Sequence, residues 1–524
     1  MPILGFGADF GQISLIFGAD FGQISLIFGA DFGQISLIFD ADFGQISLIF
    51  GADFGNYLYL CPQIAKYMAY FKRHIDEKLR EWKEDPRRKP LLIRGARQVG
   101  KSTAVRELGK TFKYFLEINL EKQPDFRKLF PENIDVRRTC ENLSGTTGIP
   151  IIPGETLLFI DEIQTSREAI MSLRYFKEDY PELHVIAAGS LLEFALEELP
   201  SFGVGRIRSL YMYPFSFDEF MMAQGLDITI DYKRKATASS PLTELAHKEL
   251  VSQLRAFYLV GGMPAAVSEW IETRSYIEVS HVHNDIIDTY NDDFSKYKKR
   301  FSPVLLRQVL RSVALQAGSK FVCSEVSNDI KSTVIREALH LLTLAGLVVP
   351  VVHSNANGVP LGAEEDRRYI KYLFFDMGVM QTLLGMTASE VLTSTEVDLV
   401  NKGGMSEMFA GLELLKYQDC HIKPELHYWQ NSGKSSQAEV DYVIAHRGMV
   451  LPVEIKASRQ GSMQSLWIFM HQHHLHDAIR SSLEPFGEFV YCDPKAGDTE
   501  RHVDIIPLYA LSNIAIPQLN FSKL

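Results

Sequence analysis

Residues 90–102 read PLLIRGARQVGKS, and this stretch decides how the chain around it is interpreted. The apolar run at 90–95 has the length of a short buried strand, and the turn after it contains two glycines. The spacing GxxxxGKS lets successive backbone N–H groups point toward one anion, beside the positive end of a following helix. The stretch therefore predicts a strand, a phosphate-binding loop and a helix that begins at Lys101.

This loop predicts a site for ATP and Mg²⁺. Lys101 is expected to reach the terminal phosphates and act in catalysis, and the Ser102 hydroxyl is expected to ligate Mg²⁺. The residues expected to hold the nucleotide are Gly95, Ala96, Arg97, Gln98, Val99, Gly100, Lys101, Ser102, Thr103, Asp161 and Ser190.

Two later apolar runs complete the expected nucleotide site. Residues 156–162 read TLLFIDE, a buried strand that ends in two acids. Asp161 is expected to hold Mg²⁺ through water, and Glu162 to orient and deprotonate the attacking water. The alternative is a buried strand capped by solvated carboxylates. A further strand at 184–190 ends in Ser190, which is expected to lie between the first and third strands and sense the γ-phosphate.

Strands that alternate with helices in this way predict a parallel sheet with helices on both faces, so the fold class is α/β. The residues here resemble a family. The segments GARQVGKS, LLFIDEIQ, AAGSLLE, GRIRSLYMYPFSFDEF and YLVGGMPAAV are similar to those of bacterial and archaeal predicted AAA-type ATPases with a C-terminal domain of unknown function. The resemblance spans residues 68–524 and implies a P-loop NTPase domain, with a RecA/AAA-like sheet, at 68–215.

Two arginines are candidates for a catalytic role in a neighbouring subunit. Arg206 and Arg208 follow a loop rich in glycine and proline and precede a strand. An arginine finger usually acts across a subunit interface, so this interpretation predicts a homo-oligomer or a protein partner. The alternative is that both arginines pair with local acids such as Glu197 or Glu198.

The middle of the chain predicts a helical lid at 216–300 and a winged-helix-like domain at 301–390. The charged run Lys296, Lys298, Lys299 and Arg300 could contact a phosphate backbone, although a solvated helix end is the more common explanation. In the second domain, the helix expected at 331–345 carries few cations. It therefore favours packing against protein over reading a DNA groove.

Residues 391–524 contain acids at the spacing of the PD-(D/E)-x-K nucleases, which this segment resembles. Asp441 is followed, after twelve residues, by Glu454-x-Lys456, and Glu407 lies in a predicted helix upstream. Glu407, Asp441 and Glu454 are expected to bind Mg²⁺, with Asp441, Glu454 and Lys456 acting on a phosphodiester. The alternative is a structural ion cluster, because related domains often keep the fold without a demonstrated reaction.

Residues 1–67 consist largely of an eleven-residue repeat. GADFGQISLIF occurs at 7–17, 18–28 and 29–39, and again at 40–50 with Asp40 in place of glycine. Two glycines per copy disfavour a helix, whereas the uncharged QISLIF favours a strand. A strand and turn array is one interpretation. The one we favour is a duplicated segment without function, with Met68 as the start of the working protein.

Composition limits the remaining possibilities. The chain has 524 residues, of which 46% are hydrophobic and 23% charged, and its formal net charge is −11. These values exclude a disordered polymer and a broadly basic nucleic-acid binder. Five cysteines without CxxC spacing indicate a reducing compartment, and no apolar run reaches the roughly 18 residues of a membrane span. We therefore expect a cytoplasmic protein without a membrane segment.

Two classes of function agree with the sequence. The first is an ATP-hydrolysing enzyme whose nucleotide cycle is coupled to a nuclease-like domain, with ATP, Mg²⁺ and DNA as candidate partners. The second is a slow nucleotide-dependent switch or scaffold whose C-terminal domain is catalytically inactive and contacts other proteins. The sequence does not decide between them.

Overall fold

The protein is described by a computed structural model. It covers strand residues 3–6, 13–17, 24–28, 35–39 and 46–50, and then residues 70–197, 199, 205–296, 301–386, 402–431, 438–456, 462–493, 497 and 499–515. The chain divides into two compact units, Met1–Tyr70 and Phe71–Leu524. The basic run at 298–300 lies outside the described residues, so its predicted role is open.

The repeat segment contains strands rather than helices. The strands are β1 (Ile3–Phe6), β2 (Ile13–Phe17), β3 (Ile24–Phe28), β4 (Ile35–Phe39) and β5 (Ile46–Phe50). Alternate copies pair in parallel, in the orders β1-β3-β5 and β2-β4. Identical ISLIF segments therefore lie in register, as their β-branched and apolar composition favours. That residues 1–67 lack a function stays a prediction.

The first sheet of the second unit has five parallel strands in the order β10-β6-β9-β8-β7. They are β6 (Leu91–Arg94), β7 (Tyr114–Asn119), β8 (Thr156–Asp161), β9 (His184–Ala188) and β10 (Arg208–Tyr211). The strand that precedes Ser190 lies between β6 and β8, as the sequence predicts. The predicted parallel α/β fold of this part is confirmed.

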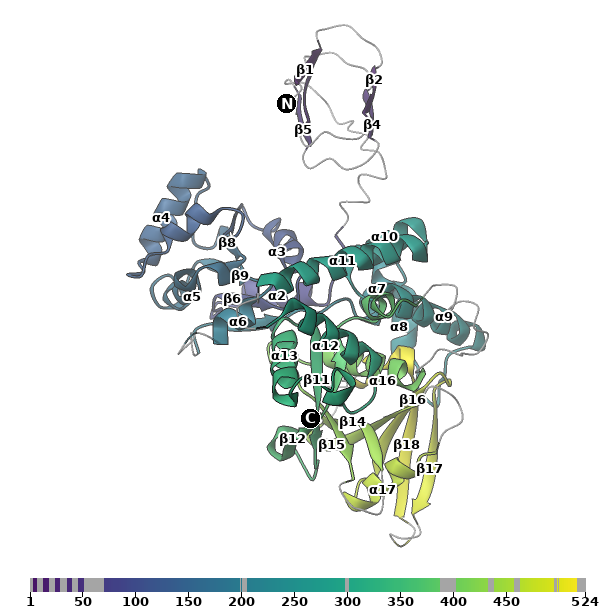
Figure 1. The fold of residues 1–524 in the computed structure, drawn as a ribbon. Helices are drawn as coiled ribbons and strands as arrows, with labels where there is room; N and C mark the ends of the chain where they lie inside the picture. Colours follow the sequence, from purple (N-terminus) through teal and green to yellow (C-terminus); the bar gives the residue numbers. More distant parts are fainter. Residues whose placement is uncertain are drawn as a thin grey trace. The chain divides into compact units, whose positions relative to one another are not determined.

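Helices follow the strands in alternation (Figure 1). They are α2 (Ile75–Glu84), α3 (Lys101–Gly109), α4 (Val136–Thr147), α5 (Arg167–Asp179) and α6 (Leu192–Glu197). Apolar side chains of α4 and α5 pack against β7, β8 and β9 in one buried core. This core covers one face of β8 through Leu158 and Ile160, and all six residues of the strand are buried.

Five helices come next in the chain. They are α7 (Phe217–Ala223), α8 (Asp227–Lys235), α9 (Glu244–Val260), α10 (Pro264–Thr273) and α11 (Tyr276–Lys296). Gly261 and Gly262 separate α9 from α10. A Cβ at Gly262 would lie 2.3 Å from the carbonyl oxygen of Phe215, so this close backbone contact requires glycine. No helix among the described residues is both long and apolar enough to cross a bilayer.

A second, mixed sheet of eight strands fills the C-terminal half, in the order β12-β11-β13-β14-β15-β16-β18-β17. The strands are β11 (Val348–Ser354), β12 (Glu365–Phe374), β13 (Leu426–Gln430), β14 (Glu439–His446), β15 (Met449–Ile455), β16 (Asp477–Ser482), β17 (Gly487–Asp493) and β18 (Thr499–Pro507). The helices are α12 (Pro303–Leu315), α13 (Ser332–Leu344), α14 (Met377–Leu383), α16 (Lys402–Lys416), α17 (Gln464–Gln472) and α18 (Ser512–Ala515).

The hairpin β11–β12 belongs to this second sheet. After α12 and α13 the two strands pair antiparallel, which is the element order expected of a winged helix. β11 also pairs in parallel with β13, so the hairpin extends the C-terminal sheet. The winged-helix interpretation and the proposed division of the chain at residue 390 stay predictions.

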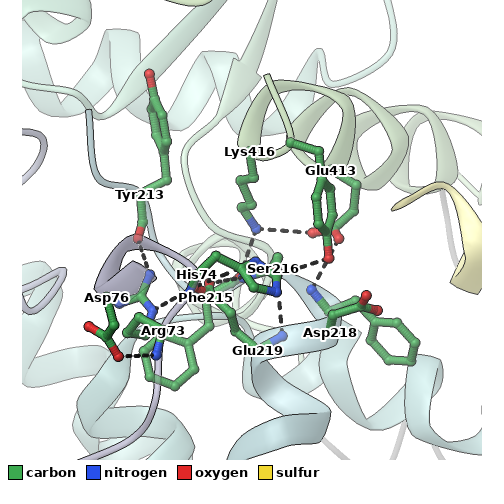
Figure 2. A network of polar contacts seen from close by, with 12 residues as sticks. Arg73, His74, Asp76, Tyr213, Phe215, Ser216, Asp218, Glu219, Glu413 and Lys416 are labelled. Atoms are coloured by element: carbon green, nitrogen blue, oxygen red, sulfur yellow. Dashed lines mark hydrogen bonds and ion pairs between the residues drawn. The ribbon is translucent and has the colours of Figure 1, made fainter. Parts of the chain in front are cut away.

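A buried polar network joins the start of α2 to the first sheet and α7 (Figure 2). Arg73 Nε donates to Glu219 Oε1 at 2.9 Å, and Nη2 donates to the carbonyl oxygen of Tyr213 at 2.8 Å. Glu219 also forms a reciprocal capping box with Ser216 at the start of α7. Burial alone would raise the pKa of Glu219, but the Arg73 guanidinium holds it at about 2.

The same network reaches α16. Glu413 Oε2 accepts a hydrogen bond from the backbone N–H of Phe217 at 3.1 Å. Lys416 Nζ donates to the carbonyl oxygen of Phe215 at 2.9 Å (Figure 2). The segment between β10 and α7 is therefore bonded on one side to Arg73 and on the other to α16.

Arg73→Met should destabilise the fold, because it leaves Glu219 buried without its counter-charge. We expect a loss of about 3 to 5 kcal/mol in the free energy of unfolding, measured by urea denaturation. Arg80→Met removes an exposed arginine of α2; it is the control and should change little. Since the folded pKa of Glu219 is about 2 against an ordinary 4.5, the loss should be complete above pH 4.5 and fade as the pH falls toward 2. Equal stability of the two variants would contradict the importance of this pair.

Candidate functional site

The glycine-rich loop connects β6 to α3, where its sequence requires unusual backbone geometry. Gly95 has φ +144°, and a Cβ there would lie 2.1 Å from the carbonyl oxygen of Met212. Gly100 has φ +96° and precedes the first residue of α3. Both positions are sterically costly for other residues, so the loop shape follows directly from its glycines.

Lys101 lies inside this loop. Its Nζ donates to the carbonyl oxygens of Gly95 at 3.0 Å and Ala96 at 2.7 Å. Burial lowers the pKa of Lys101 to about 8, although the carboxylates of Glu162 and Asp161 act in the opposite direction. The ammonium is thus held by neutral carbonyl groups, and an anionic phosphate would be a stronger partner.

The other residues of the loop contact α11, Arg73 or solvent. Arg97 and Gln98 contact α11, and the carbonyl oxygen of Val99 accepts a hydrogen bond from Arg73 Nη1 at 3.1 Å. Thr103 is exposed in the first turn of α3. All of these predicted nucleotide-binding residues therefore lie at the carboxyl end of β6, where ligands bind to parallel sheets.

The predicted Mg²⁺ ligands lie together. Ser102 Oγ donates to Asp161 Oδ2 at 3.0 Å, and Asn119 Nδ2 donates to the same oxygen at 3.1 Å. Burial and the nearby Glu162 raise the pKa of Asp161. A hydroxyl and a destabilised carboxylate are oxygen ligands of the kind that Mg²⁺ prefers, so the donor set fits this ion.

Glu162 is oriented by two neighbours. Its backbone lies in the left-handed region at φ +51°, which is uncommon for a residue other than glycine. Its Oε2 accepts hydrogen bonds from Gln164 Nε2 at 2.6 Å and from Ser190 Oγ at 3.1 Å. The structure thus places Ser190 beside Glu162, and it adds Gln164, whose role the sequence analysis missed although the residue stands in the quoted motif LLFIDEIQ.

Arg206 and Arg208 lie away from this site. Arg208 pairs in the sheet with Leu91, at the amino end of β6, whereas the nucleotide loop follows the carboxyl end. Arg206 Nε lies 3.0 Å from Glu178 Oε1, and Arg208 Nη1 lies 3.6 Å from Asp85 Oδ2. These acids differ from the Glu197 and Glu198 suggested by sequence proximity, because helix packing brings distant residues here. A role of either arginine in a neighbouring subunit stays a prediction.

The four predicted C-terminal site residues come together on the second sheet and α16. Asp441 Oδ2 accepts from the backbone N–H of Ile455 at 2.7 Å, which joins β14 to β15. Lys456 Nζ lies 2.5 Å from Glu454 Oε1. Burial raises the pKa of Glu407, on α16, and the charge of Asp441 acts in the same direction. Their hairpin and helix positions agree with the spacing argument.

Two further charged residues belong to this carboxylate cluster, which comprises Lys371, Glu407, Glu439, Asp441, Glu454 and Lys456. Lys371 Nζ, from β12, donates to Glu407 Oε1 at 2.7 Å and to Glu439 Oε1 at 2.5 Å. Lys371 is 1% exposed, and these acids raise its pKa. The sequence analysis missed Lys371 because it lies in a different predicted domain, although a lysine on a buried strand face was an available signal.

Carboxyl groups outnumber ammonium groups in the carboxylate cluster. It contains four carboxyl groups and two ammonium groups. Burial, followed by the charge of Asp441, raises the pKa of Glu454 to about 8. Burial also raises the pKa of Glu407 to about 8 and, in direction, that of Asp441. Glu454 Oε2 is buried without a hydrogen-bond partner among the described residues, so a divalent cation fits this donor set.

A smaller group of possible metal ligands lies at the starts of β12 and β13. One ligand atom each from Glu365, Glu425 and His427 lies within 4.8 Å of the others. His427 Nε2 is 3.0 Å from Glu365 Oε1, so two of the three groups already satisfy each other. The sequence analysis did not identify this group.

Comparisons with known families match three segments of the chain. Residues 87–221 match the family model of an AAA domain. Residues 251–390 and 402–511 match two domains of unknown function, DUF8612 and DUF4143. The AAA match and the parallel sheet support an AAA-type P-loop ATPase domain. The nuclease-like interpretation of the C-terminal segment stays a prediction.

Several solved structures are similar to parts of the chain. A Walker-type ATPase of Pyrococcus abyssi is 18% identical, covers 60% of this chain and 96% of its own, and has a TM-score of 0.38. A STAND protein with a tetratricopeptide repeat sensor from Pyrococcus horikoshii is 13% identical, with coverages of 67% and 46% and a TM-score of 0.25. The ADP complex of S. cerevisiae Hsp104 is 13% identical, with coverages of 54% and 40% and a TM-score of 0.25. No curated protein matches the sequence.

Nucleotide affinity should weaken as the pH rises through about 8, because Lys101 then loses the proton that attracts phosphate. A fluorescent ATP analogue titrated at pH 7 and pH 9 measures the effect. Lys101→Arg, whose guanidinium stays protonated, is the control and should show a much flatter profile even if it binds more weakly. An unchanged affinity of the parent protein between the two pH values would contradict this role of Lys101.

Proposed function

We propose that this protein binds and hydrolyses ATP at the loop between β6 and α3. The observation that carries the proposal is the placement of Glu162 beside Ser190, at the same sheet edge as Lys101 and the Ser102–Asp161 pair. A cation, a pair of metal ligands and a carboxylate base are the parts that phosphoryl transfer requires.

Each side chain of the site has a separate role in ATP hydrolysis. The attacking water forms a bond to the γ-phosphorus while the bond from that phosphorus to the bridging oxygen breaks and its electron pair leaves with ADP. Glu162 accepts the water proton, and Gln164 and Ser190 fix the direction of its carboxylate. Lys101 exchanges its carbonyl partners for phosphate oxygens. Ser102 and Asp161 would hold Mg²⁺, and the bound ion would supply positive charge to the phosphates.

We further propose that the carboxylate cluster binds a divalent cation and hydrolyses a phosphodiester. The unpartnered, buried Glu454 Oε2 and the excess of carboxyl groups over lysines in the cluster support this second function. Asp441 and Glu454 would hold the ion together with Glu407, and Lys456 would orient the nucleophile. A bound cation would supply charge for the scissile phosphate and acidify a water.

A coupled enzyme and a nucleotide-dependent switch make different predictions. In the coupled enzyme, DNA is the substrate of the carboxylate cluster, and DNA should change the ATPase rate. In the switch or scaffold, hydrolysis is slow, DNA has no effect and the C-terminal half contacts proteins. If Arg206 or Arg208 acted in the site of a neighbouring subunit or a protein partner, the ATPase rate would depend on the concentration of that protein.

Glu162→Gln should bind ATP as tightly as the parent protein but hydrolyse it at least about 100-fold more slowly, because the base is lost and the phosphate contacts remain. Lys101→Ala should instead lose tight binding. Fluorescence titration and phosphate release separate the two defects. Parental turnover by Glu162→Gln would show that another group accepts the proton.

Asp441→Ala should abolish Mn²⁺ binding at the carboxylate cluster, measured by calorimetry on the full chain. Both proteins carry Asp161→Asn to remove the contribution of the nucleotide site. Because the pKa of Glu454 is about 8, Mn²⁺ must displace a proton, so affinity should increase from pH 6.5 to pH 8. If the parent protein binds no Mn²⁺, the phosphodiesterase proposal fails and the switch is the better account.

A further inference from the structure

Three contacts join the nucleotide loop to one stretch of α11. The Tyr290 hydroxyl donates to the carbonyl oxygen of Arg97 at 2.7 Å. Gln98 Nε2 donates to Thr289 Oγ1 at 3.4 Å. Arg97 Nη1 lies 2.7 Å from Asp293 Oδ1 and 2.9 Å from Oδ2. The helix thus holds both the backbone and the side chain of the third residue of the loop.

In the Arg97–Asp293 pair the carboxylate is buried, whereas the arginine is partly exposed to solvent. Asp293 is 4% exposed, whereas the Arg97 side chain is 32% exposed. Both contacts to Asp293 use Nη1. Within the part of the chain that the structure describes, Nε and Nη2 of Arg97 make no further hydrogen bond. Asp293 therefore binds one nitrogen of the planar Arg97 guanidinium and leaves the other N–H donors of Arg97 available.

Arg97 shares its surroundings with the groups assigned to ATP hydrolysis. Burial alone would lower the pKa of Arg97, but Asp293 and then the Glu162 carboxylate raise it. The charge of Arg97 in turn lowers the pKa of Lys101. Arg97 belongs to the same loop as Lys101, whose Nζ contacts the carbonyl oxygens of Gly95 and Ala96. The loop position of Arg97 and the direction of these effects both support a guanidinium on the side where the terminal phosphate of ATP is expected.

We propose that Arg97 is a catalytic residue for ATP hydrolysis within its own chain, and that Asp293 is its positioning residue. In the proposed reaction, charge accumulates on the γ-phosphoryl oxygens and the bridging oxygen as water attacks. The free Nε and Nη2 donors of Arg97 stabilise that charge, a task that other nucleotide hydrolases give to an arginine finger. This inference rests on the proposed ATPase function and removes the need for a neighbouring subunit.

The main alternative is that the pair only fastens the loop to α11. A fastening role would weaken ATP binding and lower the melting temperature when either partner is removed. A catalytic role instead lowers kcat and leaves ATP affinity nearly unchanged, because the contacts strengthen in the transition state.

The test compares Arg97→Gln with the parent protein, Asp293→Asn and two controls. Asp288→Asn removes an exposed acid from the same helix, and Arg174→Gln removes an exposed arginine that pairs with Glu178. Arg206→Gln is measured separately, as the test of the alternative finger. We expect Arg97→Gln to lower kcat by about 1,000-fold and ATP affinity by less than about threefold. It should also lose tight binding of ADP with aluminium fluoride, a mimic of the transferred phosphoryl group.

Asp293→Asn should lower kcat less than Arg97→Gln does, since the guanidinium remains, and both controls should match the parent. The parental kcat should not depend on protein concentration. This inference would be overturned if Arg97→Gln kept the parental kcat. It would also be overturned if Arg97→Gln and Asp293→Asn lost ATP affinity and melting temperature to the same extent. Either result would leave the ATPase proposal intact. A tenfold loss in Arg206→Gln would assign the finger role to Arg206. A parent protein without ATPase activity would overturn both proposals.

Discussion

The buried ion pair between Arg73 and Glu219 holds together parts of the second unit that are far apart in the sequence. A buried guanidinium must satisfy its donors inside the protein, and Arg73 does so with Glu219 and with the carbonyl oxygens of Val99 and Tyr213. Those carbonyls belong to the nucleotide loop and to the segment after β10. One side chain therefore fixes the exits of two strands and the start of α7.

The two candidate centres contain buried groups of opposite charge. At the nucleotide loop, a single ammonium is surrounded by carbonyl oxygens and attracts an anion. At the carboxylate cluster, acids outnumber the lysines and attract a cation. At both centres a buried polar group without all of its hydrogen-bond or charge partners lowers the stability of the fold. A bound ligand of opposite charge would restore that stability.

The parts predicted from sequence were those that depend on local spacing. The loop glycines, the acids at the end of β8 and the Asp441 to Lys456 spacing all lie within short segments whose strand and helix geometry is regular. The parallel sheet followed from the same alternation. Sequence could not give contacts set by long-range packing.

Two examples show this limit. Arg97 and Asp293 are 196 residues apart, and their pairing depends on how α11 docks on the loop. Lys371 enters the carboxylate cluster because β11 pairs with β13, which joins a hairpin from one predicted domain to the sheet of another. Neither pairing leaves a periodic pattern in the sequence.

The packing of α16 against the second sheet has a structural consequence. A Cβ at Gly411 would lie 2.3 Å from the Tyr442 hydroxyl, so the helix sits directly on β14, and that hydroxyl also bonds to the carbonyl oxygen of Glu407. Lys416, nine residues further along, is bonded to the segment beside Arg73. One helix therefore contacts the sheet of the carboxylate cluster along its length and the segment next to the nucleotide loop at its C-terminal end, so the two candidate centres share a structural support.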